Sequence, residues 1–212
     1  MPLVPTAPDH APYGQLPEGG RVRPIVRWGT DVMHRTNQRV TAFDHDLRSL
    51  AADMVATMYA ADGVGLAACQ VGVDLAMFVF DCHDSTDERT VGVVCNPVVT
   101  LPEGRDRKLD EDDEGCLSLP GAYVPLARPD FATVEGQGLD GEAVRFSGDG
   151  LLARALQHET DHTRGTVFGD RLSTRWRKKL QKAHDKTAES FPEELLNLPP
   201  RPHQRMKEPE GA

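Results

Sequence analysis

Residues 150–165 read GLLARALQHETDHTRG, and this stretch decides how the rest of the sequence is interpreted. Its apolar residues recur at helical spacing and Gly165 can end a helix, so it predicts an amphipathic helix. On such a helix His158 and His162 share one face, because residues four apart lie one above the other. The pattern His-Glu-x-x-His therefore predicts a metal ion held by both imidazoles, with Glu159 placed to move a proton of an attacking water.

A catalytic metal site usually has three protein ligands and one open position, so a third ligand is needed. A metzincin would place a third His at position 168, where this chain has Phe168. A thermolysin-like peptidase would use a downstream glutamate, and the available residues are Glu189, Glu193 and Glu194. Upstream, residues 114–118 read EGCLS and offer the thiolate of Cys116. From these residues alone, both the peptidase set and the thiolate set are open.

A third segment adds to the two already described. Residues 63–70 read GVGLAACQ and combine two glycines, which allow close backbone approach, with the side-chain amide of Gln70, a hydrogen-bond donor. GVGLAACQ, EGCLS and the QHETDH of residues 157–162 resemble the three motifs of peptide deformylases, in the same order and at about the same separations. The resemblance extends over residues 21–188.

The resemblance implies an activity and the residues that perform it. Peptide deformylases hydrolyse the N-formyl group from the N-terminal formylmethionine of newly synthesised proteins and release formate. The implied metal ligands are Cys116, His158 and His162. Glu159 is then the acid-base, and Gln70 and the backbone N–H of Leu117 stabilise the oxyanion.

The same resemblance implies how substrate and metal are bound. The substrate is an N-formylmethionyl peptide, and the residues implied to bind it are Val64, Gly65 and Gly115. Gly65 meets the peptide backbone and Val64 lies near the methionine side chain. The implied metal is Fe2+, with Ni2+ or Zn2+ able to substitute for it, whereas one thiolate and two imidazoles by themselves suit zinc equally well.

Two positions depart from the commoner pattern of this family. Relatives often carry Arg directly after a Val-Pro pair, whereas here Pro125 is followed by Leu126, and Arg128 comes two places later. An ion pair made by that arginine is therefore either missing or rebuilt. One helical turn before His158, where relatives are often aliphatic, this chain has Arg154. Arg154 is expected either to narrow the methionine pocket or to pack its stem while the guanidinium reaches water.

The other elements predict an α+β fold. Apolar spacing over residues 47–58, with Asp44 as N-cap, predicts an N-terminal helix. Asp140-Gly141 predicts a tight hairpin turn. Short apolar runs predict strands at 75–80, 91–95, 131–139 and 142–146, and a last helix is expected at 173–188. We therefore expect antiparallel or mixed β-strands packed around the central metal-binding HExxH helix, with N-terminal and C-terminal helices.

Proline-rich ends divide the chain into three expected parts. Residues 1–20 predict a flexible N-terminal arm and residues 191–212 a flexible C-terminal tail, because these compositions bury too little apolar surface to offset their ordering entropy. A peptide deformylase domain is expected between them, over residues 21–190. Within it, the acidic run 103–114 is interpreted as a solvated loop.

Composition limits the partners and the compartment. The net charge of −9 argues against DNA binding, and no apolar run approaches the roughly 20 residues that cross a bilayer. Four cysteines without a CxxC pair favour a reduced cytoplasm. The basic helix at 173–188 suggests, through the family resemblance, docking to ribosomal phosphates. A catalytically inactive module that keeps the fold is the alternative to any enzyme, and it predicts no turnover.

Overall fold

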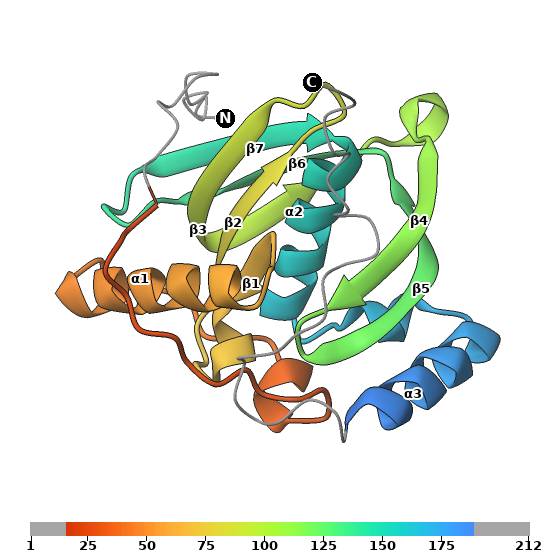
Figure 1. Ribbon diagram of the computed structural model, residues 1–212. Coiled ribbons are helices and arrows are strands. Elements are labelled where there is room, and N and C mark those ends of the chain that lie inside the picture. Colours follow the sequence, from red (N-terminus) through yellow and green to blue (C-terminus); the bar gives the residue numbers. More distant parts are fainter. Residues whose placement is uncertain (1–15, 189–212) are drawn as a thin grey trace, which may run out of the picture.

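The computed structural model describes residues 16–188, which form two antiparallel sheets and three α-helices (Figure 1). Most of the expected N-terminal arm and the whole of the expected C-terminal tail lie outside this range. Residues 16–20 are described, and Gly20 lies so close to the first helix, α1 (His45–Ala60), that a Cβ would meet the Ala52 backbone. Within the described range, none of the helices combines the length and apolar character needed to cross a membrane.

The larger sheet has five strands in the order β1-β2-β3-β6-β7, and every neighbouring pair is antiparallel. The strands are β1 (Gly65–Ala67), β2 (Met77–His83), β3 (Arg89–Thr100), β6 (Phe131–Gln137) and β7 (Ala143–Asp149). β6 and β7 form the expected hairpin, and Gly141 in its turn has a φ of 86°, which favours glycine.

β3 continues beyond the end expected at residue 95. The pairing with β6 shifts register between Cys95 and Val98, and Asn96 has a φ of 55°. This β-bulge lets the strand pass Pro97, which has no N–H to give to a neighbouring strand. The Asn96 side chain stabilises the bulge, because it both accepts from the Val40 N–H at 2.9 Å and donates to the Val40 carbonyl at 2.9 Å.

The smaller sheet consists of β4 (Leu109–Cys116) and β5 (Leu119–Pro129). The solvated loop predicted for the acidic run is therefore wrong from Leu109 onwards. The side chains before Glu114 do stand in solvent, as that prediction assumed. What makes the segment a strand is its pairing with the apolar β5, a contact between residues far enough apart in sequence to escape a local composition rule.

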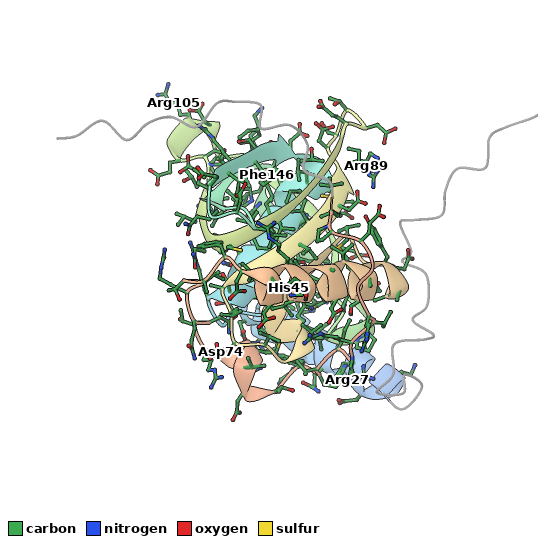
Figure 2. The ribbon with its side chains drawn as sticks, turned by 90° about the vertical axis from the view of Figure 1, so that its left-hand side faces the viewer. Arg27, His45, Asp74, Arg89, Arg105 and Phe146 are labelled. Atoms are coloured by element: carbon green, nitrogen blue, oxygen red, sulfur yellow. The ribbon has the colours of Figure 1, made fainter. Side chains whose placement is uncertain are left out.

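The helix α2 (Gly150–Thr163) lies between the two sheets, with α1 on the other side of the larger sheet's β1 end and α3 (Thr174–Ala188) outside β5 (Figure 1). Figure 2 is seen from the side that α1 covers, and it shows α1 crossing in front of the sheet. Asp44 caps α1 as expected, accepting from the Leu47 N–H at 3.0 Å. Every residue of α2 from Leu152 to Thr163 is buried. The expected α+β arrangement around a central helix is confirmed.

Candidate metal and substrate site

The ligand atoms of Cys116, His158 and His162 all lie within 4.8 Å of one another, and all three residues are buried. Cys116 Sγ is 3.3 Å from His162 Nε2, and the Nε2 atoms of the two histidines are 3.1 Å apart. One thiolate and two imidazoles form a donor set that suits zinc or iron and leaves room for a further ligand. The glutamates of the alternative peptidase set lie outside the described residues.

Two elements deliver these ligands. α2 supplies both histidines because they are four residues apart on one face. β4 ends at Cys116, where the pairing register with β5 shifts between Gly115 and Cys116. At Gly115 a Cβ would lie 2.2 Å from Cε1 of Tyr123, so only glycine lets the Tyr123 ring pack there. The last residue of β4, Cys116, therefore lies next to the two histidines of α2.

Burial shifts the pKa values of His162 and Cys69, which lie near the centre of the site. Burial and the neighbouring His158 lower the pKa of His162 and keep that imidazole neutral, which is the form that binds metals. Burial also raises the pKa of the Cys69 thiol, whose Sγ lies 3.8 Å from the His162 carbonyl oxygen. Cys69 is therefore a protonated packing residue, and the sulfur that lies with the two imidazoles is that of Cys116.

Glu159 lies in the same cavity as the ligands and is 4% exposed. Gly65 of β1 faces it so closely that a Cβ would be 2.4 Å from Glu159 Oε1. Any larger residue at position 65 would displace the carboxylate from its place beside His158. Gly65 therefore makes room for the predicted acid-base, a role additional to the substrate contact expected from the sequence.

Gln70 presents its amide nitrogen to the ligand group. Its Oε1 accepts from the Ala67 N–H at 2.9 Å, which fixes the orientation of the amide. Its Nε2 then points to Cys116 Sγ and to Ser118 Oγ, at 3.4 Å from each. Leu117 lies in the turn between β4 and β5 and lines the same cavity. Gln70 and Leu117, the two residues expected to supply oxyanion donors, therefore line the same cavity as Cys116 and His158.

The cavity at the ligand group has a volume of about 260 Å³. Cys116, His158, Glu159 and Gln70 line it, together with three acids of β4, which are Asp112, Asp113 and Glu114. Its other walls come from both sheets and from α2, and their side chains are Val64, Leu117, Tyr123, Leu151, Arg154 and Ala155. Gly65 and Gly115 border the cavity from opposite strands, so the three residues expected to bind substrate all line one small, largely apolar hollow.

Glu114 is the functional residue that sequence reasoning missed. It is 3% exposed, and its Oε1 accepts from His158 Nδ1 at 2.7 Å. A carboxylate on the far nitrogen of a metal-binding histidine fixes its tautomer and ring orientation. Burial alone would raise the pKa of Glu114, but the Arg128 charge and hydrogen bonds outweigh it and hold that pKa far below its usual range. The signal was present in EGCLS but hidden among neighbouring acids.

Arg128 settles the first departure from the family pattern. It donates to both Glu114 oxygens, at 2.6 and 2.7 Å, and to Asp161 at 3.0 Å. Arg128 thus makes an ion pair two residues after Leu126. Its side chain lies on the same face of β5 as that of Leu126, because side chains alternate along a strand.

Arg154 corrects an expectation. The alternative in which its guanidinium reaches water is wrong, because the side chain is only 8% exposed. Its Nη1 donates to Glu114 at 3.0 Å and to the Leu126 carbonyl at 2.8 Å. A buried guanidinium needs such acceptors, which here are the Glu114 carboxylate of β4 and the Leu126 carbonyl of β5.

Three comparisons with known proteins place the chain. The family model described as polypeptide deformylase matches residues 22–178. The chain is 54% identical over 162 residues to peptide deformylase 1 of Streptomyces avermitilis, covering 76% of this chain and 74% of that protein. It is 46% identical over 171 residues to a peptide deformylase of Mycolicibacterium paratuberculosis, covering 76% and 87%.

Solved structures give the same result. The crystal structure of a peptide deformylase from Legionella pneumophila aligns with a TM-score of 0.71 at 37% identity, covering 80% of this chain and 96% of that one. The peptide deformylase of Synechococcus elongatus, solved in complex with actinonin, aligns with a TM-score of 0.66 at 37% identity, covering 77% and 86%.

Proposed function

The chain belongs to the polypeptide deformylase family, and we propose that it performs the family reaction on a metal held by Cys116, His158 and His162. It is an enzyme that hydrolyses the N-formyl group from the N-terminal formylmethionine of newly synthesised proteins. The observation that carries the ligand assignment is the convergence of one sulfur and two imidazole nitrogens within 4.8 Å.

These residues have the chemistry that a catalytic metal requires. Cys116 supplies the thiolate, and His158 is held by the Glu114 carboxylate in the tautomer that leaves Nε2 free for a metal. When bound, the metal lowers the pKa of a water toward neutrality and polarises the formyl oxygen. The Cys69 thiol is kept out of the set by its raised pKa.

Glu159 is the acid-base of the proposed mechanism. Its carboxylate is buried beside His158 and faces the cavity across Gly65. It takes the proton of the attacking water and returns it to the departing amine, which leaves readily only when protonated. The tetrahedral oxyanion accepts hydrogen bonds from the Gln70 amide and the Leu117 N–H, and losing one such donor typically costs on the order of 10²- to 10³-fold in rate.

The substrate binds with its methionine side chain in the apolar part of the cavity. The apolar side chains that line it are Val64 next to β1, Tyr123 of β5, and Leu151 and Ala155 of α2. Gly65 and Gly115 border the path of the peptide backbone, where the absence of side chains allows close approach. This arrangement orients the formyl carbon toward Glu159 and the metal ligands.

We propose ferrous iron as the metal in the cell, with nickel or zinc able to substitute. Support comes from the family resemblance and from the readiness of iron to raise its coordination number. An accessible thiolate and ferrous iron are both sensitive to oxygen. Activity prepared under air should therefore decay, catalase should slow the decay, and the nickel form should be stable and more active than the zinc form. Equal activity of the zinc form and indifference to oxygen would rule out iron.

The experiment that tests the site uses anaerobically prepared protein and formyl-Met-Ala-Ser. Wild type should release equal amounts of formate and free amine. Cys116→Ala should lose the metal, measured by elemental analysis, whereas Glu189→Ala should keep both metal and activity. Release of methionine, or metal loss only in Glu189→Ala, would select the peptidase ligand set. No turnover with metal bound would select the inactive module.

We also propose that the enzyme works in the cytoplasm and docks on the ribosome through α3. All four cysteines are free thiols, which a reduced compartment favours. Six basic side chains of α3 accompany a single acid, Asp185; they are Arg175, Arg177, Lys178, Lys179, Lys182 and Lys186. Exposed positive charge of this kind is attracted by nucleic-acid phosphates.

A further inference from the structure

We propose that Arg154 is a positioning and specificity residue that clamps strand β4 to helix α2 and walls the methionine end of the cavity. The inference deepens the proposed function, because it rests on the metal site formed between the same two elements. Arg154 lies one turn before His158 on α2, and the carboxylate that it holds lies two residues before Cys116 on β4. The clamp therefore lies next to a metal ligand on each element.

The guanidinium of Arg154 joins three separate parts of the small sheet. Nη1 donates to Glu114 Oε2 at 3.0 Å and to the Leu126 carbonyl of β5 at 2.8 Å. Nη2 donates to the carbonyl of Asp110 at 3.1 Å and to its Oδ2 at 3.3 Å. A planar group with several fixed donors can span these acceptors, whereas the single ammonium of a lysine cannot.

Glu114 depends on this donor for the completion of its hydrogen bonds. Arg128 gives two N–H groups and His158 one, and Arg154 gives the fourth. Two carboxylate oxygens accept about four such bonds, so the set is complete only with Arg154. Without it, one Glu114 oxygen and the Leu126 carbonyl lose a buried donor, and the position of β4 against α2 is no longer fixed.

The stem of Arg154 has a second role. It lines the cavity together with Leu151 and Ala155 of the same helix and with Tyr123 of β5. Because the guanidinium is engaged by Glu114 and Asp110, we infer that the methylene groups are the part of Arg154 that an apolar substrate side chain would meet. The residue that fixes the metal ligands therefore also limits the size of the first side chain of the substrate.

Three substitutions separate the two roles. Arg154→Met keeps an unbranched stem and removes the guanidinium, Arg154→Ala removes both, and Arg154→Lys keeps a stem and one cation. Arg23→Met is the matched control, because Arg23 pairs with the single carboxylate of Asp53 outside the cavity. The readouts are nickel release to a chelator, kcat and KM for formyl-Met-Ala-Ser, and the ratio of kcat/KM for formyl-Met to formyl-Phe peptides.

For Arg154→Met we expect nickel release about 10-fold faster and kcat about 10-fold lower, with KM changed by less than about 2-fold. Arg154→Ala should show the same losses and, in addition, a preference for methionine over phenylalanine reduced by about 10-fold. Arg154→Lys should fall between wild type and Arg154→Met, and Arg23→Met should match wild type in every readout.

The inference is overturned if wild type binds nickel and releases formate while Arg154→Met and Arg154→Lys both release nickel at the wild-type rate. It is overturned equally if the side-chain preference of Arg154→Ala is that of wild type. Failure of wild type itself to bind nickel or to release formate would instead overturn the proposed function, so the two failures are distinguishable. Should Arg154→Ala fail to fold, the lysine and methionine variants still decide the clamp.

Discussion

The helices α2 and α3 have nearly the same length, 14 and 15 residues, and use charge in opposite ways. Every residue of α2 from Leu152 onward is buried, whereas among residues 174–186 only Leu180 is. A buried charge is costly unless it is paired and hydrogen-bonded, and the buried Arg154 and Asp161 of α2 each pair with charged side chains of other elements. An exposed charge is cheap and acts mainly at a distance.

The partners of α2 form one connected cluster. Asp161 accepts from Arg128 at 3.0 Å and also pairs with Arg171, while Arg128 continues to Glu114 and from there to His158. Removing Arg128 or Glu114 leaves the other buried members with fewer partners. On α3, by contrast, Lys179 rests 4.0 Å from the centroid of the Trp176 ring, and the other lysines extend into solvent. The four predictions below test how far this contrast holds.

The largest effect is expected at Glu159, the buried acid of α2 that is not a ligand. Glu159→Ala should lower kcat by roughly 10²-fold or more, because proton transfer to the leaving amine is lost, while the metal stays bound. Formate release and elemental analysis measure the two effects. Glu142→Ala, an exposed acid in the β6–β7 turn region, is the control and should match wild type. Full activity of Glu159→Ala would refute the assigned role.

A second effect concerns stability and tests the buried cluster. Glu114→Gln keeps the shape of the side chain but removes the charge that Arg128 and Arg154 share, so that Arg128 keeps only Asp161 and Arg154 only Asp110 as a charged partner. We expect a loss of about 3–5 kcal/mol in the free energy of unfolding, measured by urea denaturation of the metal-free protein. Glu111→Gln, an exposed acid on the same strand, should change it by less than about 0.5 kcal/mol. Similar values for the two variants would contradict the contrast.

Elements that depend on local sequence rules were predicted, and those that depend on distant contacts were missed. The spacing of His158 and His162 and the Asp140-Gly141 turn depend on local rules, and both elements form where expected. β4 was missed because its acids disfavour strands locally, and only pairing with β5 makes it one. Glu114 was missed because its partners lie 14 to 44 residues away.

The residues of the site also differ in whether the sequence could predict them. Motif resemblance named the ligands and donors that the structure brings together, because each motif is short and continuous. The buried place of Arg154 could not be predicted, since composition cannot distinguish a guanidinium in water from one held by four acceptor atoms on a neighbouring sheet. Gly65 shows the same limit, because its contact with Glu159 exists only when β1 lies on α2.

A third, smaller effect tests the exposed charges of α3. Lys178→Glu with Lys182→Glu should weaken ribosome co-sedimentation by about 10-fold at low salt and reduce the salt dependence by about two phosphate contacts. Lys179 is left unchanged because it packs on Trp176. The matched control, Arg105→Glu with Lys108→Glu, changes the net charge equally at the end of the molecule opposite α3, where Figure 2 labels Arg105. Unchanged co-sedimentation of the α3 variant would exclude docking through this helix.

The smallest effect concerns His184, the partly buried histidine of α3, whose ring meets the edge of Trp28 with centroids 6.3 Å apart. Burial, and then the charge of Arg27, lower the pKa of His184 below its usual value, while Asp185 opposes this. The folded state therefore resists protonation, so stability is full above the unfolded value of about 6.5 and declines as the pH falls through the lowered folded value.

Tm should fall between about pH 7.5 and 5.5 in both wild type and His184→Gln. Because the ring is partly solvated, the fall in wild type should exceed that in His184→Gln by no more than about 2 °C. Trp fluorescence in a Trp176→Phe background, which leaves Trp28 beside His184 as the single tryptophan, should shift over the same interval when His184 is present and stay constant in His184→Gln. His45→Gln is the control, because His45 is 91% exposed at the start of α1 and should leave the wild-type pH dependence intact. If His184→Gln retains that pH dependence, protonation of His184 does not affect stability. The half-buried side of α3 then tolerates a charge as its exposed side does, and all of α3 differs from the buried α2 in this respect.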